Sequence, residues 1–191
     1  MITRLLMGGV LVAAMALPYG QAVAQGKDDR QAKRAEVQKM ASDTLAQLYK
    51  AKPEAKGKIE KAAGYGVFSN FGITIVFLGG AGGKGMVHDN ASKKVTYMNM
   101  GQAQAGLGLG ATKYKAVFIF KDAKTLQTFV DKGLELGGQG GVAAKAGKAG
   151  AADTAGTSIH PGIEIIQLSE TGAIVGVTLA GTKYWKDGDL N

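Results

Sequence analysis

The sequence contains no cysteine, only 3 prolines and only 2 histidines among its 191 residues. Without cysteine the chain forms no disulfide, offers no cysteine nucleophile and is not attached to lipid through an N-terminal thiol, so its stability must come from packing. The histidines, His88 and His160, stand beside turn residues, and neither has a second histidine or a carboxylate at the spacing of helical metal ligands. No serine lies in a G-x-S-x-G elbow. We therefore expect no enzymatic activity, no metal site and no cofactor.

Glycine, by contrast, is abundant, with 30 residues, or about 16% of the chain against a usual share of about 7%. The scarcity of proline and the absence of a three-residue glycine repeat exclude collagen. Extensive disorder is excluded because 46% of the residues are hydrophobic and only 20% are charged. The chain is therefore folded, and its glycines need a structural reason.

Residues 1–24 have the features of a secretory signal. Arg4 gives a positive start, an apolar stretch follows, and Ala22-Val23-Ala24 matches the small-residue cleavage site. A membrane anchor is the weaker alternative, because the apolar run is shorter than the ~20 residues of a spanning helix. We predict a periplasmic or secreted protein, cleaved near Ala24-Gln25.

The formal net charge of +8 is moderate and spread over the chain. In an exported protein such an excess of positive charge favours anionic lipid or polysaccharide over nucleic acid as the partner. The plainer interpretation, that the lysines keep the surface soluble, stays open.

Residues 25–55 are predicted to form an amphipathic helix and a linker. Apolar residues from Met40 to Tyr49 recur at helical spacing, and Pro53 with Gly57 marks the end of the helix. Because the apolar stripe contains no tryptophan or phenylalanine, we expect it to pack on the protein's own domain. The alternative is a helix that lies on a membrane surface.

Farther along the chain the apolar pattern changes to the two-residue period of strands with one face in a core. Residues 89–92 supply the turn of a hairpin, while Asp122 and Gly133 begin and end an inserted helix. In residues 102–111 one face consists largely of glycine, which permits sharp coiling of a sheet. We therefore predict an α+β domain over residues 56–191, with a mostly antiparallel, strongly curved sheet or partly closed β-barrel, an N-terminal helix and one inserted helix.

Two sequence patterns lack the context that their usual functions require. Gly80 to Gly85 fits G-x-G-x-x-G, but a dinucleotide-binding loop must open a helix, and this segment continues as a strand toward Asn90. An outer-membrane barrel is disfavoured by the charged N-terminal helix, the inserted helix and an aromatic content of only 7%.

Three stretches follow one another along the chain: Lys61 to Phe68, Gly79 to Val87 and Gly172 to Gly181. Their order and spacing resemble the SYLF lipid-binding domain family. The first is similar to the family's opening A-x-G-hydrophobic-Phe strand, the second to its glycine-rich G-K-G strand and the third to its closing G-x-x-x-G-V-x-L-x-G strand. The resemblance extends over residues 56–191. It departs from the family at Thr96 to Met100, where members often carry a Trp-Ser-x-Pro-like segment.

The resemblance implies phospholipid binding without catalysis. We predict peripheral association with anionic phospholipid or a membrane surface, no nucleic-acid partner, and a protein partner that the sequence does not identify. Lysines near the start of the domain and on the central hairpin would contact lipid phosphates, and an apolar edge would enter the headgroup layer. The candidate residues are Lys56, Lys58, Lys61, Lys84, Lys93, Lys94, Tyr184 and Trp185. For Tyr184 and Trp185 the alternative, which we favour, is ordinary packing at the end of a strand.

A second hypothesis is a structural or interaction protein of the cell envelope. Gly106, Gly108 and Gly110 would then form a bare sheet face on which another protein chain packs. In that case a bulky substitution at Gly108 abolishes assembly and leaves the monomer folded.

Overall fold

The computed structural model describes residues 19–75, 80–103, 114–136, 157–173 and 181–191. Two helices precede the sheet: α1 spans Tyr19–Ala51 and α2 spans Glu54–Lys61. The prediction that the first helix ends before Pro53 is confirmed, and Pro53 stands at the N-cap of α2. Gly57, which we expected to mark the same end, lies instead inside α2. The predicted boundary between residues 55 and 56 also falls within this helix.

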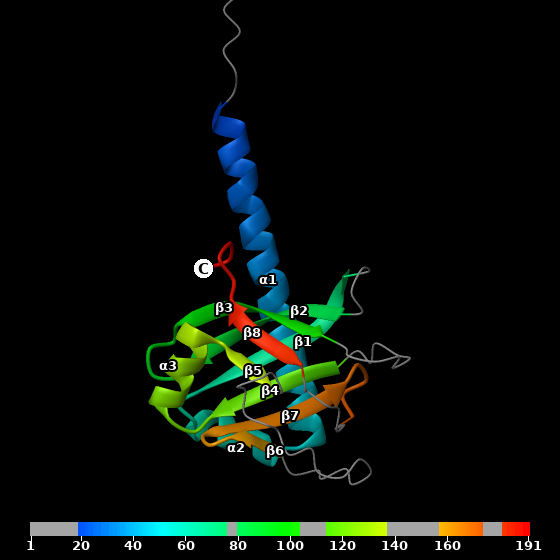
Figure 1. Cartoon of the computed structure of the whole chain (residues 1–191), viewed down its shortest axis with the longest axis vertical. Coiled ribbons are helices and arrows are strands. Elements are labelled where there is room, and N and C mark those ends of the chain that lie inside the picture. Colours follow the sequence, from blue (N-terminus) through cyan, green and yellow to red (C-terminus); the bar gives the residue numbers. More distant parts are fainter. Residues whose placement is uncertain (1–18, 76–79, 104–113, 137–156, 174–180) are drawn as a thin grey trace, which may run out of the picture.

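Eight strands form one antiparallel sheet in the described part of the chain (Figure 1). In chain order they are β1 (Gly64–Ile75), β2 (Gly80–Asp89), β3 (Val95–Ala103), β4 (Tyr114–Phe120), β5 (Leu134–Leu136), β6 (Thr157–His160), β7 (Ile163–Ser169) and β8 (Thr182–Lys186). Helix α3, Ala123–Lys132, lies between β4 and β5 in the sequence. Across the sheet the strand order is β5-β8-β3-β2-β1-β4-β7-β6. The predicted α+β fold, with N-terminal helices and one inserted helix, is confirmed.

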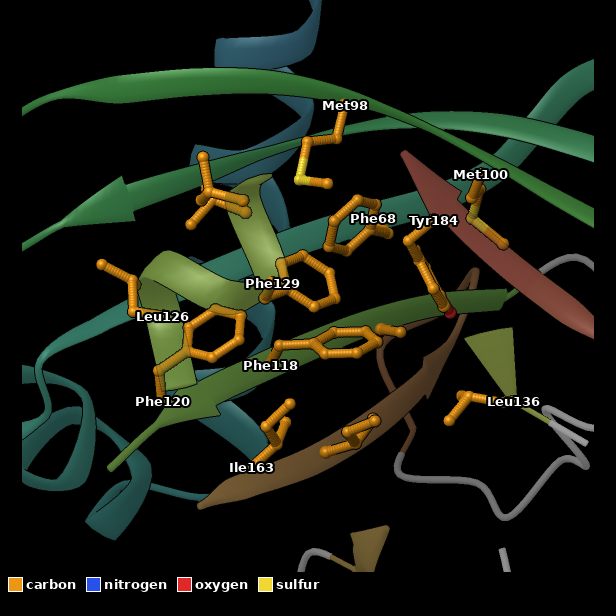
Figure 2. Close-up of a cluster of buried hydrophobic side chains, with 14 of the residues drawn as sticks. Phe68, Met98, Met100, Phe118, Phe120, Leu126, Phe129, Leu136, Ile163 and Tyr184 are labelled. Atoms are coloured by element: carbon orange, nitrogen blue, oxygen red, sulfur yellow. The ribbon is translucent and has the colours of Figure 1, made fainter. Parts of the chain in front are cut away.

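The sheet is strongly curved, as predicted. Strands β4 and β8 are separated by three strands in the sheet order, yet the ring centroids of Phe118 and Tyr184 lie only 5.0 Å apart. Phe68 on β1 contacts both rings, at centroid distances of 5.2 Å and 4.8 Å. The concave face therefore curls around an aromatic core, in which Figure 2 shows these side chains pointing toward one another.

The central strands β1 and β4 are buried on both faces, and the prediction of one buried face is wrong for β1. In β1, Phe68 belongs to the concave core, whereas its neighbour Val67 belongs to a second core on the convex face. In β4, Phe118 faces the concave core, whereas Val117 and Ile119 face the convex one. The reason is that helices cover both faces of the sheet, α3 on the concave side and α1 with α2 on the convex side.

Helix α3 begins and ends as the sequence predicts. The carboxylate of Asp122 accepts a hydrogen bond from the backbone N–H of Thr125 at 2.8 Å. Gly133 follows the last turn with φ of 72°, a conformation that favours glycine. Between these caps, Leu126 and Phe129 are buried in the concave core.

Helix α1 packs on the convex face of the sheet through its apolar stripe. Val37, Ala41 and Leu48 are buried in the convex core, and Leu45 packs against it. The prediction that this stripe packs on the protein's own domain is confirmed. Figure 1 shows the N-terminal part of α1 extending beyond the sheet, where residues 27–33 are exposed.

In the part of the chain that the structure describes, no helix combines the length and the apolar content needed to cross a membrane.

Two glycines of β2 lie where a side chain would collide with β1. A Cβ at Gly83 would meet the carbonyl oxygen of Ser69. A Cβ at Gly85 would meet the ring of Phe68 and the carbonyl oxygen of Val67. The absence of side chains at these positions therefore lets the Phe68 ring lie close to the backbone of β2. This close approach is the structural reason for glycine in the G-K-G segment.

We expect Gly85→Ala to lower the free energy of unfolding by about 1–3 kcal/mol, because the added methyl group must displace the Phe68 ring or the β1 backbone. Gly57→Ala is the matched control. An added Cβ at Gly57 has no atom within 4 Å, so the higher helix propensity of alanine should raise the free energy of unfolding by up to about 1 kcal/mol. Urea unfolding followed by circular dichroism compares the variants. Equal stability of Gly85→Ala and wild type would contradict this account of the β1–β2 contact.

Candidate functional site

The C-terminal end of α2 and the turn between β2 and β3 lie side by side, because β1 pairs with β2 and because Asn90 bonds to α2. Asn90 donates hydrogen bonds from its side-chain amide to the carbonyl oxygens of Ile59 at 2.7 Å and Ala62 at 3.0 Å. Its backbone N–H donates to the carbonyl oxygen of Ala63 at 2.9 Å. These two elements therefore form one continuous surface, although about 30 residues separate them in the sequence.

The β2–β3 turn has the chemistry that the sequence predicts. The carboxylate of Asp89 accepts hydrogen bonds from the backbone N–H groups of Ala91 at 2.8 Å and Ser92 at 3.0 Å. These two hydrogen bonds hold the pKa of Asp89 below its ordinary value, and the bond from Ser92 has the larger effect. Its negative charge is therefore engaged by the turn itself. Lys93 adopts a φ of 59° at the tip, and its side chain is exposed.

The lysines of these two elements are the predicted site residues that the structure brings together. We use the name α2–turn patch for four exposed lysines that have no acidic partner among the described residues: Lys56, Lys61, Lys93 and Lys94. Lys58 also lies on α2, but its ammonium group pairs with Glu164 on β7 at 2.8 Å. The patch is therefore the part of the predicted lipid-binding set that is exposed and available to an anion.

Three other predicted residues lie elsewhere. Lys84 donates to the carboxylate of Asp187 at 2.7 Å, so its ammonium group is engaged within the protein. Tyr184 is fully buried in the concave core because the curl of the sheet turns it toward Phe118, so its place at an exposed edge is wrong and the alternative of packing within the domain is confirmed. Burial raises the pKa of the Tyr184 hydroxyl well above its ordinary value. Trp185, the next residue, is 41% exposed.

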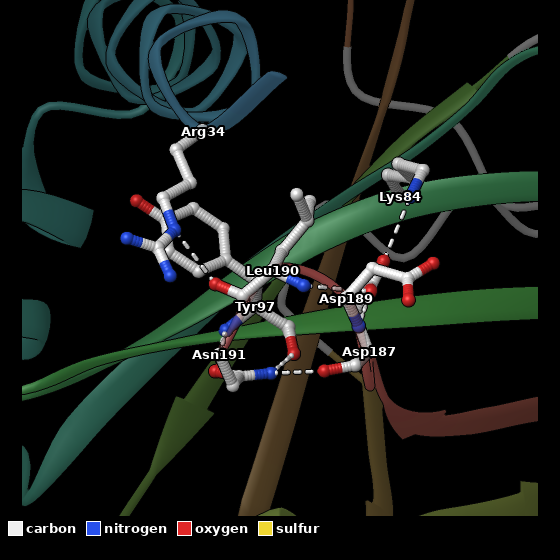
Figure 3. Close-up of polar contacts among 7 residues, drawn as sticks. All are labelled: Arg34, Lys84, Tyr97, Asp187, Asp189, Leu190 and Asn191. Carbon is white, nitrogen blue, oxygen red and sulfur yellow. Dashed lines mark hydrogen bonds and ion pairs between the residues drawn. The ribbon is translucent and has the colours of Figure 1, made fainter. Parts of the chain in front are cut away.

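A cluster of contacts around the C-terminal residues was not predicted from the sequence (Figure 3). The buried carboxylate of Asp187 accepts hydrogen bonds from the backbone N–H groups of Asp189 at 2.9 Å and Leu190 at 3.1 Å, besides the bond from Lys84. Burial alone raises the pKa of Asp187, but the Lys84 ammonium group and the two N–H groups outweigh it and hold this pKa below its ordinary value. The side chain of Asn191 completes the turn by bonding to the backbone of Tyr97.

Helix α1 contacts the same segment through Arg34. Its Nε donates to the carbonyl oxygen of Leu190 at 2.8 Å, and its guanidinium carbon lies 5.7 Å from the ring centroid of Tyr97. Arg34 stands three residues before Val37 and seven before Ala41, so it continues the buried stripe of α1 by one turn. This spacing is the sequence signal that could have identified Arg34 as part of the buried stripe.

Within the described residues, no group of three or more histidine, aspartate or glutamate side chains lies close enough together to hold a metal ion.

The ion pair of Asp187 should make stability depend on pH. Because the pKa of Asp187 is lowered by folding, its contribution is present above the unfolded-state pKa of about 3.9 and is lost as the pH falls through the folded-state value. We expect Asp187→Asn to lower the free energy of unfolding by about 2 kcal/mol at pH 7, with the difference from wild type shrinking below pH ~4. Urea unfolding between pH 7 and pH 3 measures this difference. A difference that stays constant over this range would contradict the role of the carboxylate charge.

Two comparisons with known proteins bear on the identity of the chain. Residues 101–191 match the model of the Ysc84 family, which is described as "Las17-binding protein actin regulator". The matched range contains the third of the three SYLF-like stretches, residues 172–181, and the first two precede it.

A curated relative is "Beta cell expansion factor A" from Aeromonas veronii, which is 34% identical over 157 residues. The alignment covers 82% of this chain and 58% of the relative, so the chain spans less than two thirds of the relative's length. The similarity extends well beyond the range of the family match. Residues 101–191 of the chain therefore match the Ysc84 family, the SYLF family that the three sequence stretches resemble.

Proposed function

We propose that this protein is a non-catalytic, peripheral phospholipid-binding protein that associates with anionic membranes in the periplasm or outside the cell, after cleavage near Ala24-Gln25. The match to the SYLF family supports lipid binding as the general function. The secretory features of residues 1–24 support the location. The family description also names an actin regulator, but we carry no actin-related role over to a chain that we expect to be exported.

The observation that carries the proposal is the α2–turn patch. The bonds of Asn90 to α2 bring the lysines of two elements to one surface. The acidic residues of the same two elements are Glu54 and Glu60, which are exposed on α2, and Asp89 in the turn. The carboxylate of Asp89 is engaged by the backbone N–H groups of its own turn. Each lysine near an anionic membrane contributes on the order of 1 kcal/mol. Four such lysines would supply a reversible, mainly electrostatic attachment.

The apolar contribution to membrane binding rests on one side chain. Tyr184 is buried, so Trp185 is the remaining aromatic residue of the predicted edge that could enter the headgroup layer. A single tryptophan adds a limited apolar area. We therefore expect binding that weakens strongly when salt is added.

The hypothesis of an envelope interaction protein stays a prediction. It rests on Gly106, Gly108 and Gly110, which lie outside the described residues. The glycines of β2 that the structure does describe are packed against the protein's own β1 and give it no additional support.

The test is co-sedimentation with vesicles of phosphatidylglycerol and phosphatidylcholine at low salt. We expect the double variant Lys61→Gln, Lys93→Gln to bind about 30-fold more weakly than wild type, since two lysines are worth about 2 kcal/mol. The matched control is Lys33→Gln, Lys132→Gln, which removes the same charge from exposed positions on α1 and α3. Absence of wild-type binding would refute the proposed function, and an equal loss in both double variants would refute the assignment to the patch.

A further inference from the structure

A cationic hollow of about 390 Å³ opens between α1, the start of β3 and the C-terminal residues. Tyr97 and Leu190 are among the residues that line it. The charged side chains that line it are Arg34, Lys94 and Lys186, and all three are positive. They come from α1, the β2–β3 turn and the end of β8, so the tertiary fold brings together charges that are far apart in the sequence.

Arg34 is held in place before any ligand arrives. Its Nε bonds to the carbonyl oxygen of Leu190, and its guanidinium group lies over the ring of Tyr97. Among the described residues its two terminal nitrogens have no hydrogen-bond partner, and Figure 3 shows them at the free end of the side chain. A guanidinium group fixed in this way offers planar, paired donors, the geometry that recognises phosphate.

The two lysines of the hollow are exposed and available. Neither Lys94 nor Lys186 forms an ion pair within the described residues. A smaller neighbouring hollow of about 50 Å³ places Asp89 and Asp131 near the same lysines. The Asp89 carboxylate accepts the N–H groups of its own turn, and that of Asp131 accepts a hydrogen bond from Gln127 at 2.9 Å. Both carboxylates keep their negative charge, but among the described residues neither forms an ion pair with Lys94 or Lys186.

We propose that this hollow binds a phosphate group, either in a phospholipid headgroup or in a free phosphomonoester. Three cations from three elements surround one space, which matches the charge of a phosphomonoester better than that of a single carboxylate. The volume lies within the range of about 300–1,000 Å³ that is typical of small-ligand sites, so a glycerol phosphate group fits. Phosphate binding in the hollow rests on the proposed lipid-binding function only where it names a lipid headgroup as the source of the phosphate.

The experiment uses glycerol 3-phosphate as the soluble probe, with glycerol as the uncharged control. Titration followed by amide chemical shifts should give a saturable change centred on Tyr97, Leu190 and Asn191. We expect Lys186→Gln to weaken this binding at least about tenfold. Lys183→Gln is the matched control, because it removes an exposed lysine from the same strand outside the hollow. Arg34→Lys keeps the charge but lacks the paired donors, and it should also weaken binding.

The source of the phosphate is tested with vesicles that contain phosphatidic acid in phosphatidylcholine. If vesicle binding weakens in Lys186→Gln and glycerol 3-phosphate competes for it, the ligand is the lipid headgroup. If only glycerol 3-phosphate binding weakens in this variant, the ligand is a free phosphomonoester.

The experiments can refute the phosphate site in the hollow and the proposed lipid-binding function independently of each other. If wild-type protein binds vesicles but gives no saturable shift with glycerol 3-phosphate, the proposed phosphate site in the hollow is refuted. The lipid-binding function then stays in place. Equal weakening by Lys183→Gln and Lys186→Gln would also refute the phosphate site. Saturable binding of glycerol 3-phosphate without any vesicle binding would support the hollow and refute the lipid function. Thermal unfolding of each variant confirms that the fold is retained.

Discussion

The ring of Phe68 contacts aromatic side chains from three other elements: Phe118 on β4, Phe129 on α3 and Tyr184 on β8. These contacts form only if the sheet curls enough to bring β8 over β4. The ring in turn needs the bare backbone at Gly85. Curvature, the concave core and the position of β8 therefore depend on one interlocking contact between a phenylalanine and a glycine.

The position of β8 decides where the candidate sites lie. Asp187 follows this strand directly, and its bonds to Lys84 and to the next backbone N–H groups turn the chain toward α1. There Arg34 binds Leu190 and lies against Tyr97. The aromatic core on the concave side thus controls, through β8, a polar cluster on the other side of the sheet. The two elements of the α2–turn patch are tied together by the side-chain bonds of Asn90 and by the pairing of β1 with β2, although Lys94 of this patch also lines the hollow beside Lys186.

Features that depend on neighbours in the sequence were predictable. The caps of α3 at Asp122 and Gly133 and the turn at Asp89 follow from local chemistry, and the structure has each of them. The curved antiparallel sheet followed from alternation and glycine content. Burial that depends on distant partners was not predictable. The sequence alone places Tyr184 at the end of a strand, and only the curl of the sheet shows that its ring faces Phe118.

The same limit explains the errors in the candidate site. Lys84 looks like an available cation in the sequence, and only the fold brings Asp187 to it. Burial on both faces of β1 was missed because alternation cannot show that a second helical layer covers the other face.

The bond from Arg34 to Leu190 joins residues that are 156 positions apart. During synthesis α1 emerges early, but the bond from its Arg34 to Leu190 cannot form until Leu190 has been added to the chain. A contact of this span is expected to form late, because the closure entropy of the intervening chain must first be offset by the sheet. The cationic hollow, which needs this contact, would therefore exist only in the fully folded domain and not in a partly synthesised or partly folded one.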